Sequence, residues 1–148
     1  MSARSENASR PECWNSFPRS WCFEYSEELA LIDQSVMATI FHITSQVLWE
    51  RAARETSYRP EAFPVDGFIH CSTRDQVIQV ANTRFRGQRG LVLLLIDTDK
   101  VTPAIIYENL EGGQQLFPHI YGGLNVDAVD AVLEFEPGAD GYFTLPGL

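Results

Sequence analysis

The chain has 148 residues, of which 45% are hydrophobic and 21% are charged, and its formal net charge is −9. These values are typical of a single soluble globular domain, and no apolar run approaches the roughly 20 residues of a membrane-spanning helix. The acidic balance disfavours a protein that coats extended nucleic acid, because such proteins bind through many phosphate contacts.

The charge is distributed unevenly along the chain. Residues 51–89 contain seven arginines and four acidic residues, whereas residues 90–148 contain one lysine and nine acidic residues. A local group of arginines can hold one or two phosphates. A solvated face of uneven charge is an equally good interpretation.

The first 36 residues differ from the rest in composition. They are rich in Ser, Asn, Arg and Pro, and they contain no continuous apolar stretch of the secretory kind. We expect a disordered arm, or a start codon assigned too far upstream, followed by one domain over residues 37–148. A docked extension is the alternative, because Trp14 and Trp21 are unusual in disordered tails. With only three cysteines in the chain, we expect a reducing, cytoplasmic location.

The pattern becomes regular after this segment. Residues 38–43 alternate and are β-branched or aromatic, which predicts a strand. Thr44 or Ser45 can cap a helix that runs to about residue 55. After a loop with two prolines and a glycine, residues 68–71 predict a short strand.

A second helix is predicted from Thr73 onward. Thr73 and Gln76 form a capping-box pair, apolar residues recur at helical spacing after it, and Gly87 or Gly90 ends the helix.

The second half of the chain is dominated by strands. The continuous apolar run "LVLLLID" at 91–97 predicts a central buried strand, and "AIIYEN" at 104–109 predicts another. Residues 111–123 are interpreted as a glycine-bounded loop with a short ordered piece, and residues 129–137 as a last strand. This order indicates an α+β fold with a small mixed sheet and two main helices.

Each of the three histidines sits inside an apolar stretch, which is the most informative feature of the sequence. His42 and His70 lie near the ends of predicted strands, and strand geometry allows them to meet at a sheet edge or cleft. Imidazole can bind a sugar hydroxyl or a carbonyl, and it can act as an acid or a base. Half-buried structural histidines are the alternative interpretation.

Two further site types are weaker. The three histidines with Glu108 could ligate a metal, but no local ligand motif is present, so we expect none. Cys71 points to the opposite face from His70 and is interpreted as a small core residue rather than a nucleophile. The arginines at 84, 86 and 89 suit a helix end as well as a phosphate clamp.

Six blocks resemble, in their order and spacing, the bacterial family called domain of unknown function 952. The resemblance covers residues 38 to about 135. The blocks are "FHIT", "GFIHCST", "VANTRFRG", "LVLLLID", "YEN" and "LFPHIYGGL".

That family in turn resembles, more remotely, the ADP-ribosyltransferase fold and its RNA 2′-phosphotransferases. These enzymes use one histidine on an early strand, matched by His42, and a second, matched by His70, to face NAD in the cleft of a split sheet. Glu108 is the nearest candidate for their late-strand glutamate, and Arg84 and Arg86 are candidates for their phosphate-binding arginines. His119 belongs to the pattern of the 952 family itself.

The resemblance implies a small split-sheet domain that binds NAD or another nucleotide and transfers an ADP-ribosyl or phosphoryl group to a small molecule. A catalytically silent module that binds a small ligand is the second hypothesis, and a histidine-ligated metal enzyme is the third. The implied catalytic residues are His42, His70 and Glu108. The implied ligand-binding residues are His42, His70, Ser72, Thr73, Arg84, Arg86, His119 and Tyr121.

Overall fold

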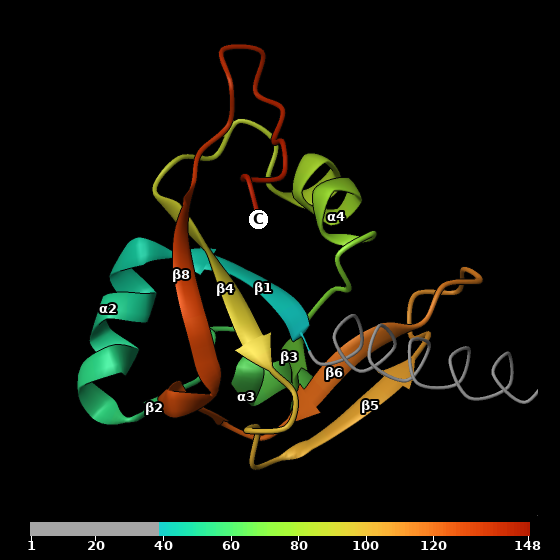
Figure 1. Cartoon of the computed structure of the whole chain (residues 1–148). Helices are drawn as coiled ribbons and strands as arrows, with labels where there is room; N and C mark the ends of the chain where they lie inside the picture. Colours follow the sequence, from blue (N-terminus) through green and yellow to red (C-terminus); the bar gives the residue numbers. More distant parts are fainter. Residues whose placement is uncertain (1–38) are drawn as a thin grey trace, which may run out of the picture. The chain divides into compact units, whose positions relative to one another are not determined.

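The computed structural model describes residues 39–148 (Figure 1). The expectation of a disordered arm over residues 1–36 lies outside the described residues. The strands are β1 (Thr39–Ser45), β2 (Ser57–Tyr58), β3 (Ile69–His70), β4 (Leu91–Asp97), β5 (Ala104–Glu108), β6 (Phe117–Tyr121), β7 (Leu124–Asn125) and β8 (Val129–Phe135). The helices are α2 (Gln46–Glu55), α3 (Phe63–Asp66), α4 (Val77–Arg84) and the 3-10 turn η3 (Val126–Ala128).

The chain forms several small sheets with α2, α3 and α4 around them, so the coarse α+β expectation is confirmed. The strand orders are β1-β4-β8, β2-β7 and β3-β6-β5. Every ladder within residues 39–148 is antiparallel. The mixed sheet that we expected is therefore wrong, because each described strand runs opposite to its hydrogen-bonded neighbours, although most paired strands are far apart in the sequence.

The predicted central strand is confirmed in β4, which lies between β1 and β8. Its two faces contribute to separate cores. Leu94 and Ile96 pack with Ala52 of α2, whereas Leu93 packs with Ala81 of α4. The helices α2 and α4 therefore cover opposite faces of this sheet (Figure 1).

Local capping signals explain where the helices begin. The Ser45 side chain accepts a hydrogen bond from the Leu48 N–H at 3.2 Å and caps α2. The Gln76 Oε1 atom accepts from the Thr73 N–H at 3.0 Å, as the capping-box pattern predicts. However, α4 itself begins only at Val77, after a turn.

The segment predicted as a loop over 111–123 contains the central strand of the second sheet. The strand β6 pairs with β3 on one side and β5 on the other. The sequence did not predict this strand because Pro118 and the flanking glycines are residues that usually indicate turns.

The two three-stranded sheets are joined at one point and diverge from it. Phe41 of β1 and Ser72 exchange backbone hydrogen bonds of 2.8 Å in both directions, and Cys71 N donates to the Pro118 carbonyl of β6 at 2.9 Å. The result is a split sheet. Within residues 39–148, no helix combines the length and the apolar character that crossing a bilayer requires.

Candidate functional site

A cavity of about 580 Å³ lies beside the point where the sheets separate. Its walls come from β1, the start of α2, Tyr58 of β2, α3, β3, α4 and β6. His42, His70 and His119 all line it, together with Ser72 and Arg84. The structure thus brings five of the residues selected from the sequence to one cavity.

Both ring nitrogens of His42 are engaged within the protein. Its Nδ1 atom lies 2.6 Å from the backbone oxygen of His70, and its Nε2 atom lies 2.8 Å from the Tyr58 hydroxyl. The side chain is buried. His42 therefore ties β1 to β3 across the split and orients its neighbours, and neither nitrogen remains for a ligand.

The protons of this network follow from the electrostatics. Burial is the main cause that lowers the pKa of His42 to about 4, so the ring is neutral at pH 7. A carbonyl oxygen only accepts, hence Nδ1 carries the ring hydrogen and Nε2 accepts from the Tyr58 hydroxyl. Burial also raises the pKa of Tyr58 to about 12, which keeps that hydroxyl protonated. Since Tyr58 has one proton, the Thr44 hydroxyl 2.8 Å away donates to it.

We expect the stability of the protein to fall in mild acid because of His42. In the unfolded chain the pKa of His42 returns to about 6.5. Between pH 6.5 and pH 4, His42 is therefore protonated in the unfolded state but neutral in the folded state. The contribution of neutral His42 to the free energy of unfolding is fully present above about pH 6.5. Lowering the pH from about 7.5 to about 5 removes roughly 2 kcal/mol of it. Urea denaturation at the two pH values measures it. A His42→Leu variant should show a correspondingly weaker pH dependence, and an unchanged dependence would contradict the assignment.

His70 presents its side chain to the cavity and is the most accessible of the three histidines, with 45% of its side chain exposed. Its Nε2 atom lies 3.5 Å from a carboxylate oxygen of Asp66. Asp66 ends α3, and Gly67 turns the chain in the left-handed region (φ 79°), which returns the strand over that carboxylate. Partial burial and then His119 lower the pKa of His70, while Asp66 opposes this change. A neutral, accessible imidazole near pH 7 can both donate and accept protons.

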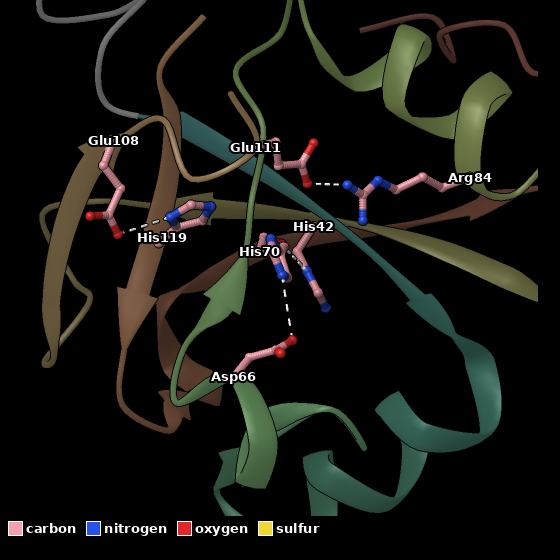
Figure 2. Close-up of polar contacts among 7 residues, drawn as sticks. All are labelled: His42, Asp66, His70, Arg84, Glu108, Glu111 and His119. Carbon is pink, nitrogen blue, oxygen red and sulfur yellow. Dashed lines mark hydrogen bonds and ion pairs between the residues drawn. The ribbon is translucent and has the colours of Figure 1, made fainter. Parts of the chain in front are cut away.

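His119 pairs with His70 across the β3–β6 ladder, and the two rings meet edge to face at 5.1 Å. Its Nδ1 atom lies 3.0 Å from Glu108 Oε1, so Nδ1 donates to that carboxylate. The Tyr121 hydroxyl donates to the same oxygen, and the bonds from Tyr121 and then His119 lower the pKa of Glu108. Figure 2 shows Glu108 beside His119, on the side away from His70 and His42. Glu108 and Tyr121 do not line the cavity.

Phe68 forms an aromatic surface beside the exposed ring of His70 and the buried ring of His119. Its ring centroid lies 4.8 Å from that of His70, 4.4 Å from that of His119 and 5.2 Å from that of Tyr121. Such packing restricts the orientation of both imidazoles and offers a flat apolar face to a ligand.

Arg84 is the arginine of its group that reaches the cavity. It forms an ion pair with Glu111, which lies between β5 and β6 and also lines the cavity (Figure 2). Arg86 instead stacks over the Tyr142 ring at 4.1 Å, and Arg89 lies 3.6 Å from Glu136. Neither of these two lines the cavity, and neither does Thr73.

Several cavity residues were missed by sequence reasoning. Tyr58, Asp66, Phe68 and Glu111 occupy loops or short elements without a periodic pattern. A polar or aromatic residue in such a place carries no local signal of its spatial partner. Of these four residues, Asp66 alone had a sequence signal that could have been used, because it lies four residues before His70 in a turn-prone stretch.

Cys71 is buried, as a core residue should be, although it also lines the cavity together with His70. It is buried in the core that contains Ile40 and Leu94, and burial raises the pKa of its thiol. A neutral thiol is a poor nucleophile. Within residues 39–148, no three histidine, cysteine, aspartate or glutamate side chains are grouped so that they could hold a metal ion.

Comparisons with known proteins place these residues within a family of proteins. The family model described as protein of unknown function (DUF952) matches residues 43–132. The crystal structure of protein CC0527 from Caulobacter crescentus is similar, with a TM-score of 0.66 and 32% identity, over 72% of this chain and 93% of that chain. The solution NMR structure of CC0527 gives a TM-score of 0.63 and 33% identity, over 72% and 91% of the two chains. Among curated proteins there is no match.

Proposed function

We propose that this chain, which belongs to the family described as protein of unknown function DUF952, binds a small nucleotide-like molecule in its histidine-lined cavity, with NAD as the first candidate. The observation that carries the proposal is the convergence of His70, His119 and Arg84 on one cavity. Its volume of about 580 Å³ falls within the range of roughly 300–1,000 Å³ that is usual for small-molecule sites.

The charges around the cavity suit a ligand that carries both signs. Glu61 and Asp66 line the part built by α3 and the segment before it, whereas Arg84 approaches from the end of α4. His70 lies between Asp66 and Arg84 (Figure 2). NAD has a cationic nicotinamide ring and an anionic pyrophosphate, so each end finds an opposite charge. Phe68 adds an apolar face for a planar ring.

In this proposal the protein transfers an ADP-ribosyl or phosphoryl group to a small acceptor in the cytoplasm. His70 would hold a ribose hydroxyl and move a proton, with Asp66 orienting its ring. His119, oriented by Glu108, would accept a second hydrogen bond through Nε2. The two sheets that diverge from the Phe41–Ser72 bridge support an ADP-ribosyltransferase-like split sheet.

A catalytically silent binding module is the second candidate, and two observations favour it. Glu108, which resemblance to ADP-ribosyltransferases would make catalytic, does not line the cavity. Both nitrogens of His42 are held by protein groups. A transferase therefore needs another carboxylate, and among the described residues Glu61, Asp66 and Glu111 are the acidic side chains that line the cavity.

Ligand binding is expected to raise the melting temperature of the full-length protein. NAD or ADP-ribose at 100 times its dissociation constant should add about 2.7 kcal/mol to the free energy of unfolding. Adenosine, which lacks the phosphates, should stabilise the protein less at equal concentration. Release of nicotinamide from NAD then separates a transferase from a silent module. The absence of a thermal shift with any of these nucleotides would remove both candidates.

A further inference from the structure

Arg84 and Glu111 form an ion pair in the lining of the cavity. Both side chains line the cavity, and about half of each is exposed, at 50% and 51%. They come from elements far apart in the chain, the last residue of α4 and the segment after β5. Among residues 39–148, Glu111 is the ion-pair partner of Arg84.

Glu111 belongs to a preformed loop, residues 109–116, which we call the 109–116 loop. Asn109 Oδ1 accepts hydrogen bonds from the backbone N–H groups of Glu111 at 3.1 Å and Gly112 at 2.9 Å. At the other end, Gln76 Nε2 donates to the Leu116 carbonyl at 2.8 Å and fastens the loop to the start of α4. These bonds hold the backbone around Glu111 in place, and its exposed side chain reaches Arg84 from there.

The pair is poised to exchange partners. An exposed ion pair contributes little to stability, so it opens easily. A guanidinium binds phosphate with the same fork geometry as carboxylate, and a phosphate group carries more charge. Both members of the pair act electrostatically on His70, because Arg84 lowers the pKa of His70 and Glu111 raises it. The subsite thus lies within electrostatic reach of the most accessible histidine.

We propose that Arg84 forms an oxyanion subsite that takes a phosphate group of the ligand, and that Glu111 occupies this subsite until the phosphate displaces it. This inference rests on the proposed function for the identity of the whole ligand, but not for the exchange itself. Glu111 acts as an internal competitor that weakens the binding of stray anions. Its release frees the 109–116 loop from α4 beside the cavity.

Pyrophosphate is the probe for the exchange, measured by calorimetric titration of the full-length protein. The Glu111→Gln variant should bind pyrophosphate about three- to tenfold more tightly than the wild type, because both the competitor and its repulsion are removed. Arg84→Gln should bind at least about tenfold more weakly. In the Arg84→Gln background the gain from Glu111→Gln should vanish, as a double-mutant cycle requires for coupled residues. Amide hydrogen exchange in the 109–116 loop should become faster when pyrophosphate binds.

A matched control exists in the same region. Glu136→Gln removes one carboxylate charge from the Arg89 pair, which lies outside the cavity, and should leave pyrophosphate affinity unchanged. Equal affinity of the wild type and Glu111→Gln, no pyrophosphate binding by either, or a gain that persists without Arg84 would overturn the inference. Failure of NAD and ADP-ribose to bind, with the pyrophosphate effects intact, would instead refute the proposed function alone.

Discussion

Replacing His70 by asparagine is expected to slow the release of nicotinamide from NAD by about 10²–10³-fold, the usual cost of one lost transition-state hydrogen bond in a shielded site. His70 is the histidine with the most exposed side chain; the ion-pair partner of its ring is Asp66, which is itself exposed, and its ring packs against Phe68 and His119. The melting temperature should therefore change little. The affinity for ADP-ribose should fall by about two- to tenfold, since a hydrogen bond between a neutral imidazole and a ribose hydroxyl contributes about 0.5–1.5 kcal/mol.

Two comparison variants sharpen this experiment. Tyr107→Phe alters an exposed side chain on β5 outside the cavity and should leave turnover unchanged. Asp66→Asn keeps the shape but removes the charge that opposes the lowering of the His70 pKa, so the pH profile of turnover should move to lower pH. Unchanged turnover in His70→Asn would exclude a catalytic role for this residue. NAD binding without nicotinamide release by the wild type would favour the silent module.

Replacing His42 by leucine is expected to be the most damaging of these changes for stability. The variant keeps a similar volume but leaves the His70 backbone oxygen without the His42 ring, and the Tyr58 hydroxyl with Thr44 alone. Each buried polar group that loses its partner costs about 1–3 kcal/mol. Urea denaturation of the two proteins at neutral pH measures the loss.

The double variant with Tyr58→Phe distinguishes a hydrogen-bond network from simple packing. Tyr58→Phe alone removes the hydroxyl between His42 and Thr44. If the network is coupled, the two substitutions together should cost less than the sum of the single costs. Strict additivity, or a loss below about 0.5 kcal/mol for His42→Leu, would show that His42 only fills space.

The sequence alone was sufficient for the elements whose signal is local. The continuous apolar run of β4 predicted a central strand because a strand buried on both faces needs apolar residues throughout. Ser45 and the apolar stripe after it predicted α2, and the histidines in apolar stretches pointed to a shared polar site. These features depend on residues within one element, so their pattern survives in the sequence.

Contacts between distant segments were decided only by the tertiary structure. The strand β6 forms because β3 and β5 complete its hydrogen bonds, although its proline and flanking glycines indicate a loop. Glu108 was expected in the cleft, yet it accepts a hydrogen bond from the His119 ring and does not line the cavity. The point at which α4 ends decides which of the neighbouring arginines faces the cavity. Arg84, its last residue, pairs with Glu111, whereas Arg86 stacks on Tyr142. Which side chains pair with each other depends on how the elements pack, because burying one group also fixes the partners of its neighbours. No local spacing of residues encodes these pairings.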